Sequence, residues 1–203
     1  MTDGCGLVDR FAAMHATEGL PFDQGAARET LQAAARHEAG HALVAYATGL
    51  PVEFARMLPD FAPHLLGVVR VLAGAHDPWC VAAYALAGPV ADAIVEPDEW
   101  ESDPFNLLEA AELGDGHDDA GVAFEALGRL YSSHGHTLNA FGRTHERVRV
   151  WLAGHWGAVQ TLAGALMERG NVPRDELVEI ANEHGIKRPD RALIPRRRRR
   201  AGL

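Results

Sequence analysis

The chain has 203 residues, of which 47% are hydrophobic and 23% are charged, and its formal net charge is −9 at pH 7. These are ordinary globular values, and the acidic balance argues against a general nucleic-acid binder. Cys5 and Cys80 make neither a disulfide framework nor a C-x-x-C site, so we expect a cytoplasmic protein. The most apolar stretch, Trp79 to Val95, contains Pro89 and Asp92 and is too short and interrupted to predict a membrane span.

The first predicted helix follows a loose N-terminal lead-in, residues 1–22. From Gly25 to Thr48 the chain is rich in Ala, Leu, Arg and Glu and contains no proline, which favours a helix. Apolar residues recur there at steps of three and four, so one face is expected to be buried. Gly49 is placed to end the helix as a C′ glycine.

This helix carries the most informative motif of the chain, His37-Glu38-Ala39-Gly40-His41. The H-E-x-x-H spacing puts both imidazoles on one helix face, where they can hold one metal ion. Imidazole is a good zinc ligand, and zinc lowers the pKa of a bound water to about 7. Glu38 stands beside the first ligand and can act as general base. We therefore predict a Zn²⁺ site with His37 and His41 as ligands and Glu38 as the catalytic residue.

Two strands are expected after the motif. Val52 to Met57 is predicted as a short strand, residues 59–63 as a loop, and Gly67 to Leu72 as a second strand because it is rich in β-branched residues. The two strands would pair as an antiparallel hairpin beside the metal helix. The edge of such a hairpin can bind an extended peptide by strand addition, and the residues expected to align it are Val68, Val69, Arg70 and Val71.

The rest of the chain is predicted to be helical. Asp77-Pro78 is a helix start, with Asp as the N-cap and Pro at the first helical position. The predicted helices cover residues 78–95, 105–113, 118 or 119 to 131, 138–169 and 174–183. The fold class is therefore mainly α with a small antiparallel β-hairpin. One domain is expected over residues 23–185, followed by a basic tail, residues 186–203.

The third metal ligand cannot be chosen from spacing alone. A catalytic zinc site needs three protein ligands and an open position. The candidates are Glu109, Glu112, His117, Asp118 and Asp119.

Three segments together resemble the peptidase domain of FtsH-type zinc metalloproteases. The first is residues 37–42 with the two strands that follow. The second is residues 86–92, Leu-Ala-Gly-Pro-Val-Ala-Asp, which is similar to the family's L-A-G-x-x-A-E helix. The third is residues 117–123, where an Asp followed four residues later by Ala is the family's third zinc ligand. The resemblance implies a helical, zincin-like peptidase domain over about residues 25–184, with Asp119 as the ligand and Asp118 as the alternative one residue away.

The chain departs from the family in three ways. Asp92 stands where the family has Glu, and the stretch between Asp92 and Asp119 is longer than usual. The ATPase module is missing, because no G-x-x-x-x-G-K-[ST] segment is present and the one lysine is Lys187. The resemblance therefore implies a stand-alone zinc-dependent metalloendopeptidase, ATP-independent as a single chain, that hydrolyses flexible polypeptide segments.

Partners and an alternative function also follow from the sequence. Arg196 to Arg200 could bind an acidic partner or a separate unfoldase. The resemblance also raises a homo-oligomer as an expectation, because relatives that carry the ATPase form rings. The alternative is a metal-stabilised regulatory or binding module with little or no turnover. The intact Glu38 favours the enzyme.

Overall fold

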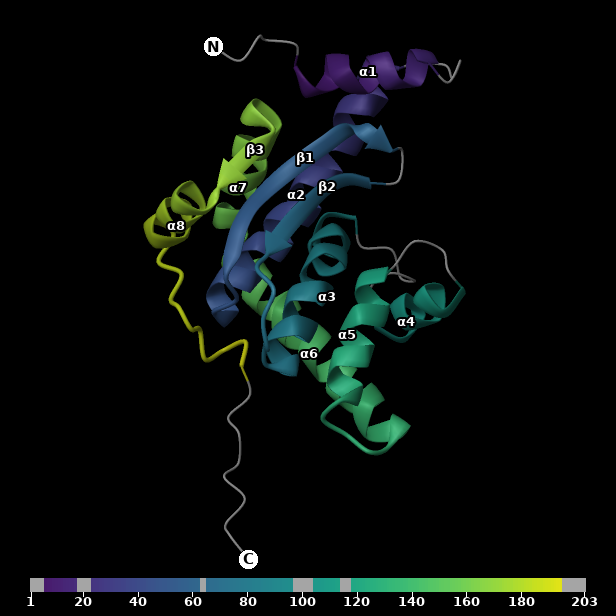
Figure 1. Cartoon of the computed structure of the whole chain (residues 1–203), viewed down its shortest axis with the longest axis vertical. Coiled ribbons are helices and arrows are strands. Elements are labelled where there is room, and N and C mark those ends of the chain that lie inside the picture. The colour runs from purple at the N-terminus through teal and green to yellow at the C-terminus, as the bar shows by residue number, and fades with distance from the viewer. Residues whose placement is uncertain (1–5, 18–22, 63–64, 97–103, 114–117, 195–203) are drawn as a thin grey trace, which may run out of the picture.

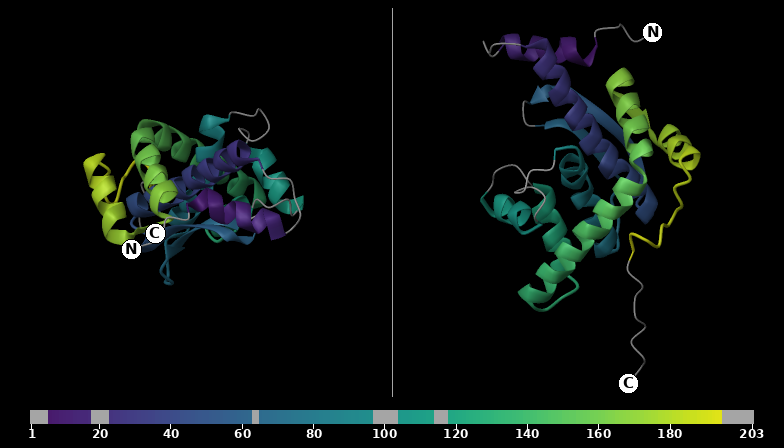
Figure 2. Two further views of the ribbon diagram at one scale, coloured as in Figure 1. Left: turned by 90° about the horizontal axis from the view of Figure 1, so that it is seen from above. Right: turned by 180° about the vertical axis from the view of Figure 1, so that it is seen from behind.

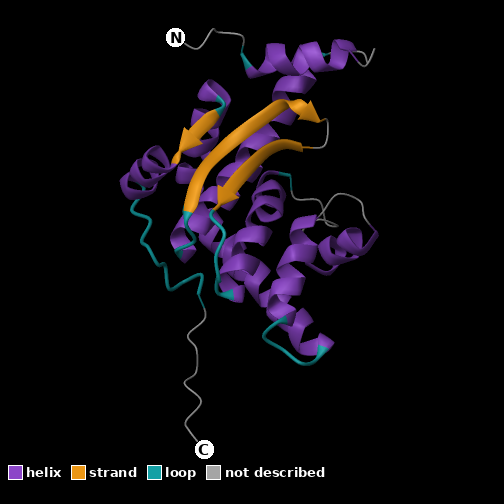
Figure 3. Ribbon diagram, viewed as in Figure 1, coloured by secondary structure: helices purple, strands orange, loops and turns teal. Residues whose placement is uncertain are grey.

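The computed structural model describes residues 6–17, 23–62, 65–96, 104–113 and 118–194. Within them the chain is mainly helical and has one small antiparallel sheet (Figure 3). The expected mainly α class is therefore confirmed at this level. The elements, in chain order, are α1 (Leu7–Thr17), α2 (Gln24–Thr48), β1 (Val52–Ala62), β2 (Leu65–Val71), α3 (Pro78–Val95), α4 (Pro104–Leu113), α5 (Asp118–Gly128), α6 (His134–Gly154), α7 (Trp156–Arg169), β3 (Asn171–Pro173) and α8 (Arg174–Glu183).

Helix α2 is the centre of the fold (Figure 1). It begins where the Asp23 carboxylate accepts a hydrogen bond from the Ala26 N–H, which is a typical N-cap. It ends at Gly49, whose φ of 90° is the left-handed conformation that glycine adopts without steric cost. Every residue from Glu38 to Thr48 is buried and His37 is partly buried, so the H-E-x-x-H motif lies at the edge of the interior. The predicted helix is thus confirmed.

The sheet has the strand order β2-β1-β3 and is antiparallel throughout. Helices α2 and α7 pack against the sheet from behind (Figure 2). The expected hairpin is present, but β1 continues to Ala62 through the segment predicted as a loop. The third strand was not predicted, because β3 is only three residues long and includes Pro173.

Helix α3 packs on α2 and supplies one wall of the site. Asp77 caps it and Pro78 is its first residue, as predicted. The helices approach closely, since a Cβ added at Gly40 would lie 2.6 Å from the Ala87 carbonyl oxygen. By length and composition α3 could cross a membrane, and 56% of it is buried inside the protein.

Both ends of the described chain extend the packed body beyond the expected limits of residues 23–185. The expected lead-in contains α1, whose Leu7 and Phe11 are buried in the core. At the other end Ile186 and Leu193 are also buried. The helix predicted over residues 138–169 is interrupted at His155, where α6 ends and α7 begins.

Candidate metal centre

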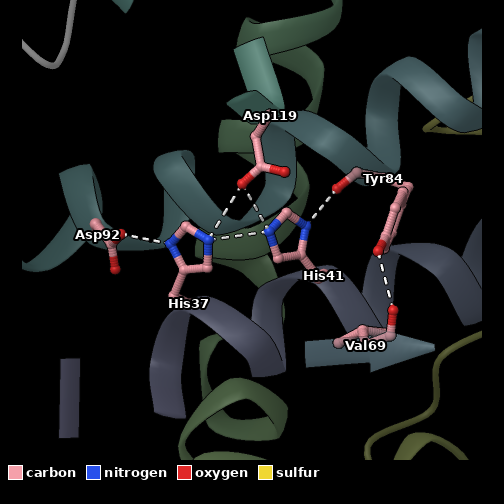
Figure 4. Close-up of polar contacts among 6 residues, drawn as sticks. All are labelled: His37, His41, Val69, Tyr84, Asp92 and Asp119. Carbon is pink, nitrogen blue, oxygen red and sulfur yellow. Dashed lines mark hydrogen bonds and ion pairs between the residues drawn. The ribbon is translucent and has the colours of Figure 1, made fainter. Parts of the chain in front are cut away.

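Two helices bring three potential metal ligands together (Figure 4). His37 and His41 lie one turn apart on α2, and Asp119 lies in the first turn of α5. The Nε2 atoms of the two histidines are 3.0 Å apart. The Asp119 Oδ2 atom lies 3.3 Å from the His37 Nε2 atom and 3.1 Å from the His41 Nε2 atom. The three atoms therefore form a nearly equilateral triangle.

Helix α3 fixes the orientation of both imidazoles. The His37 Nδ1 atom lies 2.7 Å from the Asp92 carboxylate, and the His41 Nδ1 atom lies 2.7 Å from the Tyr84 backbone carbonyl. A carbonyl oxygen can only accept, so the His41 Nδ1 donates, and the carboxylate imposes the same arrangement on His37. Each Nε2 of a neutral ring is then left with a lone pair that points at the other ligand atoms. Such partners of metal-binding histidines set the tautomer and the ring orientation.

The geometry fits a zinc ion. Three lone pairs at this separation repel one another unless a cation or a proton lies among them. Tetrahedral zinc with bonds of about 2.0–2.1 Å requires ligand atoms about 3.3 Å apart, which is close to the observed triangle. Space for it depends on Gly88, because a Cβ there would lie closer than 3.0 Å to both Nε2 atoms and 2.5 Å from the His37 Cε1. Two histidines and one carboxylate are also a common ligand set for catalytic zinc.

The charges of the metal-free site follow from the same contacts. Burial alone would lower the pKa of His37, but hydrogen bonds to Asp119 and Asp92, together with the charges of Asp92 and Glu38, raise it to about 10. Burial would raise the pKa of Asp119, but its hydrogen bonds with His37 and His41 hold it well below the usual range. Without a metal the triangle therefore retains a proton near neutral pH.

Glu38 lies between α2 and the sheet, and only 8% of its surface is exposed. Its side chain packs directly over Gly67 of β2. Burial raises the pKa of the Glu38 carboxyl, and the charges of His41 and His37 oppose that shift. A carboxylate with a raised pKa is a stronger proton acceptor, as general-base catalysis near neutral pH requires.

The free edge of β2 is partly occupied. The Met57 N–H points to the β3 side of β1, where it donates a hydrogen bond to the carbonyl of Gly170, the residue before β3. Ala55, two residues earlier in β1, directs its backbone groups to the same side. Val69 of β2 pairs with Ala55, and it therefore directs its backbone groups away from β1. There the Val69 carbonyl accepts a hydrogen bond of 3.2 Å from the Tyr84 hydroxyl (Figure 4). Burial raises the pKa of that hydroxyl, so it remains a donor.

The substrate strand expected from the sequence is thus β2, but its residues are not equivalent. Val68 and Arg70 direct their backbone groups toward β1, opposite Arg56 and Phe54. An added peptide would therefore meet the backbone of Gly67, Val69 and Val71, and the carbonyl of Val69 already has a partner.

The other candidate ligands are not part of the triangle formed by the described residues. Glu109 lies on α4 and is exposed. His117 lies outside the described residues, and so do the side chains of Glu112 and Asp118. The basic run Arg196 to Arg200 also lies outside the described part of the chain.

No model of a known protein family matches this chain, and no match was found among curated proteins. The site itself therefore carries the functional argument. Sequence reasoning missed Gly88 and the backbone carbonyl of Tyr84. Neither role can be recognised from the residue type, because Gly88 contributes only the absence of a side chain and Tyr84 contributes a backbone carbonyl, which every residue has.

Proposed function

We propose that the protein is a zinc-dependent metallopeptidase that cleaves peptide bonds in flexible polypeptide segments. The observation that carries the proposal is the convergence of His37 Nε2, His41 Nε2 and Asp119 Oδ2, with the buried carboxylate of Glu38 next to the first ligand in sequence. The resemblance of these segments to the FtsH-type peptidase domain supports the same reaction.

Each residue of the site has a distinct task in this proposal. His37, His41 and Asp119 would hold the zinc ion, and Asp92 and the Tyr84 carbonyl would keep the imidazoles oriented toward it. Zinc, when bound, supplies Lewis-acid chemistry that acidifies water and polarises a carbonyl. Glu38 would take a proton from the attacking water and transfer it to the amine that leaves when the C–N bond breaks.

The substrate would be an extended, unfolded segment. Strand addition uses backbone groups at a sheet edge, and β2 provides that edge close to Glu38. A folded protein cannot offer its backbone in this way. Because the chain has no P-loop, a separate unfoldase or an acidic partner bound through Arg196 to Arg200 would have to deliver folded substrates.

Replacing Glu38 by glutamine tests the proposal, since the amide keeps the size of the side chain but cannot accept a proton in the same way. The variant should bind one zinc ion as the parent does, while cleavage of an unstructured protein such as casein falls by about 100-fold or more. Equal cleavage by parent and variant, at equal zinc content, would refute the peptidase. Parent protein that binds zinc but cleaves nothing would instead favour the metal-stabilised binding module.

A further inference from the structure

Gly67 of β2 lies directly under the side chain that the proposed function uses as a base. A Cβ added at this residue would lie 2.7 Å from the Glu38 Oε1 atom, 2.8 Å from Cδ and still closer to Cγ. Real Cβ atoms essentially never approach other atoms to less than 3.0 Å. The Glu38 side chain therefore occupies the space that any larger residue at this position would need.

Backbone conformation does not explain this glycine. The described glycines with a positive φ are Gly49, Gly170 and Gly185, so alanine could adopt the backbone of Gly67. A glycine inside a strand also weakens it, and such a residue often marks a site where another group approaches closely. At Gly67 the approaching group is the Glu38 carboxylate.

The strand under Glu38 is itself held in place relative to the metal ligands. Two residues beyond Gly67, the Val69 carbonyl accepts the hydrogen bond from the Tyr84 hydroxyl. The backbone carbonyl of the same tyrosine accepts the hydrogen bond from His41. One residue of α3 thus connects the strand that supports Glu38 with a ligand of the zinc site.

From these contacts we infer that Gly67 is a positioning residue, whose missing side chain leaves the space (the seat) in which the Glu38 carboxylate lies beside the metal centre. Tyr84 keeps the strand that forms this seat in place relative to His41. The catalytic assignment rests on the function proposed above. Substitution of Gly67 should displace Glu38 and leave the three metal ligands where they are, because none of them is among the nearest atoms.

Gly67→Ala tests the inference, with Gly164→Ala as the control because a Cβ at that exposed position of α7 meets nothing within 4 Å. Gly67→Ala should keep zinc at the parent's stoichiometry and lower kcat at least tenfold, toward the value of Glu38→Gln. It should have little further effect when combined with Glu38→Gln. A kcat within twofold of the parent, or loss of zinc from the single variant, would overturn the inference.

A second measurement does not depend on turnover. Thermal unfolding is compared for the parent, Gly67→Ala, Glu38→Ala and the double variant. Gly67→Ala should lower Tm in the parent, where Glu38 is in the way, and leave it unchanged or raised in Glu38→Ala. Equal Tm changes in the parent and in Glu38→Ala would refute the positioning role of Gly67, whether or not the protein is a peptidase. If Gly67→Ala does not fold but the double variant does, the seat is supported; failure of both to fold overturns it.

Discussion

Gly88→Ala should remove zinc binding while leaving the helix intact. The new Cβ would lie 2.5 Å from the His37 Cε1 and too close to both Nε2 atoms. The imidazole of His37 must therefore retreat by more than about 0.5 Å to reach the 3.0 Å limit, because its Nε2 atom is even closer to the new Cβ than its Cε1 atom is. Hydrogen bonds to Asp92 and to the Tyr84 carbonyl oppose the retreat of the two rings. Metal sites tolerate deviations of about 0.2 Å, so the displacement is large on this scale.

The energetic consequence can be estimated from linkage. We expect the zinc Kd to rise at least 100-fold, which is about 2.7 kcal/mol. At free zinc 1,000 times the parent Kd, zinc stabilises the parent by about 4.1 kcal/mol, and a 100-fold weaker site leaves about 1.4 kcal/mol. For a chain of this size the difference corresponds to a Tm lower by about 5–10 °C in the presence of zinc.

Isothermal titration with zinc and thermal unfolding with and without zinc measure both quantities. The metal-free variant should unfold within a few degrees of the metal-free parent, because alanine has a higher helix propensity than glycine by about 1 kcal/mol. Gly164→Ala is the matched control and should bind zinc as the parent does. A Gly88→Ala variant with a zinc Kd within threefold of the parent would refute the proposed position of the metal.

The remaining predictions concern protons, the outer partner of His37 and the C-terminal segment. Because the pKa of His37 is raised to about 10, zinc binding at pH 7.5 should release about one proton. The enthalpy measured by isothermal titration with zinc should then depend on the ionisation enthalpy of the buffer, and an enthalpy independent of the buffer would contradict the prediction. The same raised pKa stabilises the metal-free fold below pH 6.5, and this contribution should be lost as the pH rises toward about 10, which thermal unfolding across that range would reveal. Asp92→Asn should weaken zinc binding by about 10–100-fold, and equal affinity would deny that this carboxylate orients His37. Leu193→Ala, at a residue only 2% exposed, should lower the free energy of unfolding by about 2–4 kcal/mol in urea titrations, and a change below 0.5 kcal/mol would show that the segment is not packed as described.

The limits of sequence reasoning are clearest at the ends of the chain and in the sheet. Helix α1 was not predicted, although Leu7 and Phe11 form part of the core. The strand β3 is too short for a periodic pattern, and it exists because β1 offers an edge at Ala55. The burial of Ile186 likewise depends on tertiary contacts that no local sequence pattern predicts.

What the sequence determined by itself is the local part of the site. Residues four apart on a helix share a face, so the spacing of His37 and His41 predicted two of the three potential ligands and the place of Glu38 without any tertiary information. Helix α2 and its end at Gly49 followed from propensity and capping, which are also local, whereas its N-cap Asp23 was not predicted.

Only the tertiary structure decided which groups meet that face. Asp119 lies 78 residues beyond His41. By spacing alone, several acidic residues of the same region were equally good candidates for the third ligand, and the packing of α3 and α5 brings Asp119 to the two imidazoles. The seat at Gly67 and the carbonyl of Tyr84 depend on the same packing. Local patterns repeat every few residues along the chain, whereas contacts between distant residues depend on how all the helices and strands pack at once.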